Sequence, residues 1–194
     1  MLILYAINLK SKLVKLHLGC GSKHISGFIH IDILDAPHID HKQRIETLPE
    51  FPDGSVDLIY ACHVLEHFSR WTYKSALQEW FRVLKPSGGV LRLAVPDFAA
   101  CAKIYHEHGL ADGLSGLIGL IVGGQRNEYD IHYMIFDQQL LEDSLREVGF
   151  TSVRYWDWRC TDHCDVDDYS QAYLPHLDKQ NGTLMSLNLE AIKQ

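Results

Sequence analysis

Two glycines flanking a cysteine, with an aspartate further along, could together bind a nucleoside-containing cofactor. The stretch KLHLGCGSKHISGFIHIDI contains Gly19, Cys20, Gly21 and Asp32. Glycine lets the backbone turn sharply and approach a ligand without a Cβ in the way. A carboxylate at the end of a strand can accept hydrogen bonds from both hydroxyls of a ribose. The pattern therefore predicts a cofactor site, with a simple strand-ending turn as the alternative.

The same stretch disfavours NAD as the cofactor. A dinucleotide fingerprint has a third glycine and an acidic residue about 20 positions further on. This sequence has His24 in the place of the third glycine, and Asp32 follows Gly19 by only 13 positions. The phosphate-binding part of a dinucleotide site is therefore missing.

Histidines are the candidate general bases, because histidine most often exchanges a proton near neutral pH. His63 directly follows an apolar run, where it could contact a cofactor or act as a base. His132 lies in GGQRNEYDIHYMIF (residues 123–136) and is our first choice for a base or an acceptor contact. A partly buried histidine that fixes this loop is the alternative. For His67 we expect a structural hydrogen bond.

We predict no metal site. Five residues near the C-terminus could be assembled into a zinc site on paper: Cys160, His163, Cys164, Asp165 and His176. Their C-x2-H-C spacing fits no structural zinc pattern, and adjacent ligands constrain a tetrahedral geometry badly. We interpret residues 159–183 as a polar insertion, in which three residues could contact a polar acceptor such as a sugar: Tyr169, Tyr173 and His176.

Apolar runs and helical spacing predict the elements that position these residues. Runs bounded by turn residues predict strands at 13–18, 28–33, 56–61 and 90–95, and two closing strands at 151–158 and 184–192. Apolar residues at helical spacing predict one helix between Ser69, a possible cap, and Pro86. A second helix is expected between its cap Asp137 and Gly149.

Strands that alternate with helices predict a mostly parallel α/β sheet, doubly wound, with helices on both faces. The two closing strands have no helix between them, so they should form an antiparallel hairpin. Ligands of such sheets bind at the carboxyl ends of the strands. We expect one domain of 194 residues, in which residues 113–136 form a lid over the acceptor.

Composition limits the partners and the compartment. The chain is 46% hydrophobic and 22% charged, with a formal net charge of −7, which is typical of a globular protein and unlike a nucleic-acid binder. Its five scattered cysteines favour a reducing, cytoplasmic compartment. The N-terminal run MLILYAI is too short to span a membrane. It could supply the contact surface of a homodimer, or else an edge strand or a cover over the core.

Four stretches in order resemble motifs of the class I S-adenosylmethionine-dependent methyltransferases, type 11 branch: LHLGCG, LPEFPDGSVDLIYACHVLEHF, EWFRVLKPSGGVLRLAVPDF and LLEDSLREVGF. The resemblance covers roughly residues 13–160 and implies a Rossmann-like, seven-stranded sheet that binds S-adenosylmethionine. It implies that Gly19 and Gly21 hold the amino-acid end of the cofactor and that Asp32 holds the ribose. The cofactor contacts that it implies are Gly19, Cys20, Gly21, Asp32, Ile33, Leu48, Cys62 and His63.

The sequence departs from the family pattern at two points. The segment between the glycine turn and Asp32 is short, so the usual first helix must be reduced to a turn or two. Arg44 stands where related enzymes often carry an acid that contacts adenine.

The resemblance implies methyl transfer to a small-molecule or sugar-linked acceptor. The pattern, including the terminal SLNLEA, resembles that of enzymes of surface-polysaccharide or secondary metabolism. For a hydroxyl acceptor, His132 or His63 would be the base. The alternative is a subunit that binds the cofactor without catalysis and acts in regulation or assembly.

Overall fold

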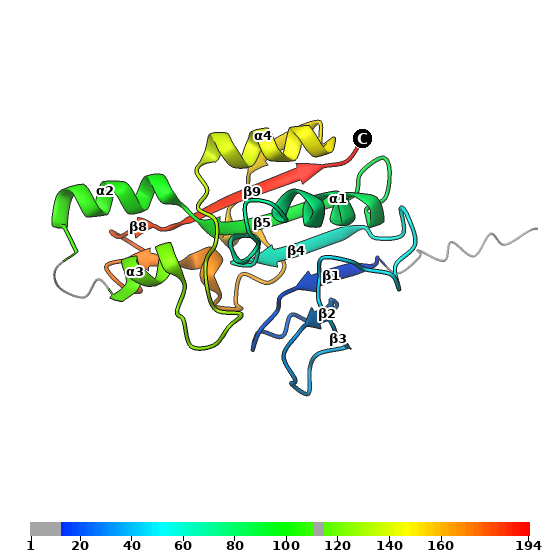
Figure 1. Cartoon of the computed structure of the whole chain (residues 1–194), viewed down its shortest axis with the longest axis horizontal. Helices are drawn as coiled ribbons and strands as arrows, with labels where there is room; N and C mark the ends of the chain where they lie inside the picture. Colours follow the sequence, from blue (N-terminus) through cyan, green and yellow to red (C-terminus); the bar gives the residue numbers. More distant parts are fainter. Residues whose placement is uncertain (1–12, 111–114) are drawn as a thin grey trace, which may run out of the picture.

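A seven-stranded sheet in the order β3-β2-β1-β4-β5-β9-β6 forms the centre of the computed structural model, which describes residues 13–110 and 115–194 (Figure 1). Its strands are β1 (Lys15–Leu18), β2 (Ile29–Asp32), β3 (His41–Lys42), β4 (Leu58–Cys62), β5 (Val90–Pro96), β6 (Ser152–Tyr155) and β9 (Ser186–Ile192). Strands β1 to β5 are parallel, and β9 is antiparallel to both β5 and β6. The predicted Rossmann-like, mostly parallel seven-stranded sheet with an antiparallel C-terminal hairpin is confirmed.

Helices α1 (Tyr73–Val83) and α4 (Gln138–Val148) lie side by side on one face of the sheet and bury the main hydrophobic core (Figure 1). The predicted cap of α4 is confirmed, because the Asp137 carboxylate accepts a hydrogen bond from Leu140 N at 2.8 Å. The predicted cap of α1 is wrong. Ser69 is in a preceding turn, where its N–H donates to Thr72 Oγ1 at 3.1 Å, and Thr72 is the residue before the helix.

The opposite face carries a row of polar side chains and no long helix in the described part of the chain. His17, Tyr60, Arg92, Glu190 and Arg154 lie in register on neighbouring strands. Arg154 is exposed, whereas Tyr60 and its neighbours are covered by the loop between β1 and β2 and by the segment after β6, which contains η2 (Trp158–Cys160) and η3 (Tyr169–Gln171). Helices were expected on both faces, and this expectation is met on one face only. The loop between β1 and β2 consists of turns, as its short length predicts.

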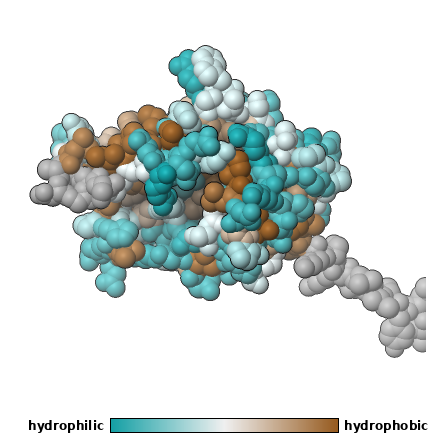
Figure 2. Space-filling view, turned by 60° about the horizontal axis from the view of Figure 1, so that its bottom comes forward, coloured by the Kyte–Doolittle hydropathy of each residue, from teal (hydrophilic) through white to brown (hydrophobic). Residues whose placement is uncertain are grey.

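Two further helices lie beyond the carboxyl ends of the strands (Figure 1). Helix α2 (Phe98–His108), which the sequence analysis did not assign, packs on α3 (Ser115–Val122) and on the hairpin of β7 (Tyr173–Leu174) and β8 (Thr183–Leu184). Hydrophobic residues are visible at this end of the molecule (Figure 2). No helix within the described residues is long and apolar enough to cross a membrane. The MLILYAI segment lies outside the described residues.

The loop after α3 runs across the carboxyl ends of β4 and β5. Tyr133 N and Met134 N both donate to the Glu66 carbonyl, which belongs to η1 (Leu65–His67) just after β4. Phe98 N donates to Phe136 O at 2.9 Å, next to the end of β5. The predicted lid segment thus lies where the ligands of such sheets bind.

Candidate active site

The glycine turn follows β1 and has a backbone conformation that favours glycine. Gly19 and Gly21 have φ angles of 60° and 53°. A Cβ at Gly19 would come within 2.5 Å of Val64 Cγ2, so this glycine is required by packing. A Cβ at Gly21 would meet nothing within 4 Å. Gly21 therefore borders open space, into which a ligand can approach the backbone.

Asp32, at the end of β2, faces this turn and is 6% exposed. Its Oδ2 accepts a hydrogen bond from Gly21 N at 2.7 Å, and its Oδ1 accepts one from Leu34 N at 2.8 Å. A carboxylate oxygen can accept two hydrogen bonds, so each oxygen keeps a lone pair for a ribose hydroxyl. The open space at Gly21 and these free acceptor positions fit a nucleoside cofactor.

Four other residues of the predicted cofactor set differ in their surroundings. The thiol of Cys20 is buried in the turn, and burial, assisted by Asp32, raises its pKa to about 12. Burial also raises the pKa of Cys62, at the end of β4, well above its usual value. Ile33 follows Asp32 and is half-buried. Leu48 is fully buried in the main core, where its N–H donates to Glu79 of α1 at 2.6 Å.

His63 is held at the end of β4 in a left-handed conformation with φ 52°. Its N–H donates to Ala94 O at 2.8 Å, and its Nε2 lies 3.3 Å from Ser186 Oγ. The ring of Tyr169, which the C-terminal insertion contributes, stacks on the His63 imidazole with centroids 5.1 Å apart. Among Tyr169, Tyr173 and His176, Tyr169 is thus the one that the structure brings onto a predicted site residue.

The two predicted catalytic histidines meet at one carboxyl group, that of Glu66. His63 Nδ1 lies 3.5 Å and His132 Nε2 lies 3.8 Å from Glu66 Oε1. Glu66 is 1% exposed, and burial raises its pKa to about 8. Glu66 was not predicted from the sequence. Its position between His63 and His67 was a local signal, but its partner His132 is far away in the sequence.

Backbone carbonyls orient the histidines on the lid side of Glu66. His132 Nδ1 lies 3.0 Å from Leu120 O, and His67 Nδ1 lies 3.0 Å from Ile131 O. The predicted structural hydrogen bond of His67 is therefore confirmed. Burial lowers the pKa of His63 to about 3 and that of His132 to about 4. Both imidazoles are uncharged at neutral pH and have a nitrogen that can accept a proton.

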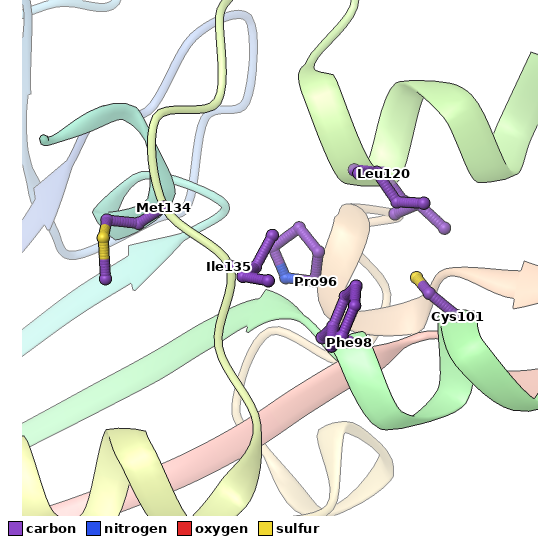
Figure 3. A pocket seen from close by; sticks show the side chains of 7 residues that line it. Pro96, Phe98, Cys101, Leu120, Met134 and Ile135 are labelled. Atoms are coloured by element: carbon purple, nitrogen blue, oxygen red, sulfur yellow. The ribbon is translucent and has the colours of Figure 1, made fainter. Parts of the chain in front are cut away.

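A shallow apolar hollow opens beside this cluster (Figure 3). The end of β5, the first turn of α2, helix α3 and the lid loop each contribute side chains to it: Pro96, Phe98, Cys101, Leu120, Ile121, Met134 and Ile135. Met134 and Ile135 closely follow His132 in the sequence. The hollow is therefore next to the histidines, and its free volume of about 10 Å³ has room for about one water molecule.

Comparison of the sequence with known proteins points to one family. The family described as "Methyltransferase domain" matches residues 34–91. The chain is 30% identical over 115 residues to the ubiquinone/menaquinone biosynthesis C-methyltransferase of Cronobacter sakazakii, covering 57% of this chain and 45% of that protein. It is 32% identical over 117 residues to the Salmonella arizonae protein of the same name, covering 57% and 45% respectively.

Solved methyltransferase structures superpose on nearly the whole chain. An S-adenosylmethionine-dependent methyltransferase from Archaeoglobus fulgidus superposes with a TM-score of 0.56 at 15% identity, over 95% of this chain and 87% of that one. The chain has the fold of the S-adenosylmethionine-dependent methyltransferases, and its residues 34–91 match their methyltransferase domain. A methyltransferase of Burkholderia thailandensis, solved with bound 1,6-didemethyltoxoflavin and S-adenosylhomocysteine, shares the methyltransferase fold with a TM-score of 0.55 at 14% identity, over 93% and 71%.

The sequence match to methyltransferases covers only part of this chain and of its relatives. The chain spans about 45% of the length of the curated relatives named above. At 14–15% identity, the solved structures establish the fold of this methyltransferase and leave its acceptor open.

Proposed function

We propose that this chain transfers a methyl group from S-adenosylmethionine to a small-molecule or sugar-linked acceptor, through a hydroxyl. The observation that carries the proposal is the pairing of Asp32 with the open glycine turn. This pairing presents a carboxylate and a closely approachable backbone at the carboxyl ends of adjacent strands. It suits a ribose and an amino-acid group, and a carboxylate also suits the positive charge of a sulfonium.

Seven residues would hold the cofactor in this proposal. Gly19 and Gly21 receive its amino-acid end, Asp32 binds the ribose hydroxyls, and the remaining contacts come from Cys20, Ile33, Cys62 and His63. We leave Leu48 out, because its side chain is fully buried in the core. When bound, S-adenosylmethionine supplies a methyl group with a good leaving group, so the chain must orient the acceptor and exclude water.

His63 is the proposed base, and His132 is the proposed acceptor contact. A hydroxyl must lose its proton as its oxygen attacks, and His63 Nδ1 would take it. The Nε2 of His63 donates to Ser186 Oγ, because the Ser186 hydroxyl itself donates to Asn188 Oδ1 at 2.9 Å. The lid loop would enclose the acceptor.

The test is release of S-adenosylhomocysteine from purified protein given S-adenosylmethionine and a panel of sugars, phenols and other alcohols. We expect turnover with a hydroxylated compound, and loss of turnover in His63→Ala. A matched control is His106→Ala, which removes an exposed histidine of α2. Turnover only with amines or carbon acceptors would refute the hydroxyl assignment. Cofactor binding with no turnover across the panel would favour the non-catalytic regulatory or assembly subunit.

A further inference from the structure

The Glu66 carboxyl group is buried without a hydrogen-bond partner for either oxygen among the described residues. Buried carboxyl groups are normally paired with a donor or a cation, because burial removes their hydration. The groups around Glu66 provide no such donor. Its close nitrogen neighbours are His63 Nδ1 and His132 Nε2.

Each of these two nitrogens carries a lone pair. His132 Nδ1 faces the Leu120 carbonyl at 3.0 Å, and a carbonyl can only accept, so Nδ1 holds the proton and Nε2 is free. His63 Nε2 donates to Ser186 Oγ, which leaves its Nδ1 free. His67 has the same arrangement as His132: its Nδ1 faces the Ile131 carbonyl at 3.0 Å, so Nδ1 holds the proton and Nε2 is free. Lone pairs therefore face the Glu66 carboxyl group, and a proton on Glu66 or a bound cation would satisfy them.

The arrangement is typical of a transition-metal site. Histidine ligands commonly donate their second ring nitrogen to a backbone carbonyl, which fixes the tautomer. One ligand atom from each of Glu66, His67 and His132 lies within 4.8 Å of the others. In a tetrahedral zinc site with ligands at about 2.0–2.1 Å, neighbouring ligand atoms are roughly 3.3 Å apart. The three ligand atoms are thus slightly farther apart than they would be around a bound zinc ion.

We propose that Glu66, His67 and His132 bind a divalent transition metal, zinc above all. Two imidazoles and a carboxylate suit zinc, whereas magnesium and calcium prefer oxygen ligands alone. The site departs from our expectation that the chain has no metal site, because that expectation concerned Cys160 to His176. The residues that the structure brings together are close to β4 and in the lid loop.

Three protein ligands leave one position open, as in catalytic zinc sites. The use of that position rests on the proposed function. An acceptor hydroxyl bound there loses its proton to His63 Nδ1, which lies 3.5 Å from the ligand atom Glu66 Oε1. The O–H bond breaks and its electron pair stays on the oxygen, which the metal stabilises. The contact of His132 with the acceptor is then made through the metal.

The test begins with protein stripped by a chelator and titrated with zinc by calorimetry. Glu66→Gln and His132→Ala are compared with His106→Ala, whose histidine is exposed on α2. Glu66→Gln keeps the shape of the side chain and removes only its charge, so the variant should fold. We expect one equivalent of zinc in wild type and in His106→Ala, and binding weakened about 100-fold or more in the two site variants.

A cobalt titration separates this site from the exposed thiols of Cys160 and Cys164. We expect a visible spectrum without thiolate charge transfer. No zinc binding by wild type, equal binding by all variants, or a thiolate spectrum that disappears in Cys160→Ser/Cys164→Ser would overturn the proposal. Titration of the stripped and loaded proteins with S-adenosylmethionine distinguishes this failure from failure of the proposed function, because the cofactor residues are separate from the metal ligands.

Discussion

The Asp32 carboxylate accepts a hydrogen bond from the Gly21 N–H at 2.7 Å. Because Gly21 follows β1 and Asp32 ends β2, this bond joins the glycine turn to the neighbouring strand. Asp32 therefore has a structural task, which is to hold the turn, in addition to its proposed task of binding a ribose.

The two glycines of the turn should respond differently to alanine. Gly19→Ala should lower the free energy of unfolding by about 2–4 kcal/mol, because the new Cβ is strained by the left-handed backbone and overpacks Val64. Gly21→Ala should cost only about 1 kcal/mol, from the backbone alone. Its Cβ would occupy the open space of the proposed site and weaken cofactor binding. Urea denaturation measures the first effect and calorimetry the second; equal losses of stability would contradict this account.

Removing the aromatic ring that stacks on His63 should slow the proposed reaction. Tyr169 is 57% exposed, so its truncation should leave the fold intact. We expect Tyr169→Ala to lower kcat/KM by about 2- to 10-fold, the usual value of an aromatic pair, and Tyr169→Phe to keep most of the rate. Tyr155→Ala is the matched control, because Tyr155 is equally exposed on β6. If kcat/KM fell as much in Tyr169→Phe as in Tyr169→Ala, stacking of the ring on His63 would not explain the loss.

Glu190 should make the stability of the sheet depend on pH. Its carboxylate accepts hydrogen bonds from Arg92 and Arg154 on the neighbouring strands, and although burial opposes ionisation, these arginines lower its pKa. A lowered pKa in the folded state stabilises the protein above the unfolded value of about 4.3. This contribution is lost as the pH falls through the folded value.

Denaturant titrations of wild type and Glu190→Gln across the acid range measure this effect. At pH 7 the substitution should cost about 3 kcal/mol, because it leaves Arg92 without its charged partner. The two proteins should converge as the pH falls below 4. A constant difference in stability at every pH would contradict the proposed role of ionisation.

Local patterns were sufficient to predict most of the sheet and two helices. The apolar runs of β1, β2, β4 and β5 and the spacing in α1 and α4 are properties of short segments. Strand β3 has only the two residues His41–Lys42, which leave no periodic signal. Helix α2 buries few residues, so its apolar stripe is weak. The face without helices could not be foreseen, because it depends on packing of the C-terminal insertion.

The cofactor half of the site was predictable for the same reason. Gly19, Gly21 and Asp32 carry their signal within one short stretch. The pairing of Glu66 with His132 joins residues on either side of α1, α2 and α3, and only the folded lid loop brings them together. The burial of Leu48 was not foreseen, because it depends on contact with α1.

Calorimetric titration with S-adenosylmethionine tests the central claim most directly. Wild type is compared with Asp32→Asn, which keeps the shape and removes the charge, and with Asp35→Asn, an exposed aspartate three positions on. The account predicts saturable binding by wild type and Asp35→Asn, and binding weakened at least 10-fold in Asp32→Asn. Absence of binding to folded wild-type protein, or equal binding by all three proteins, would contradict it.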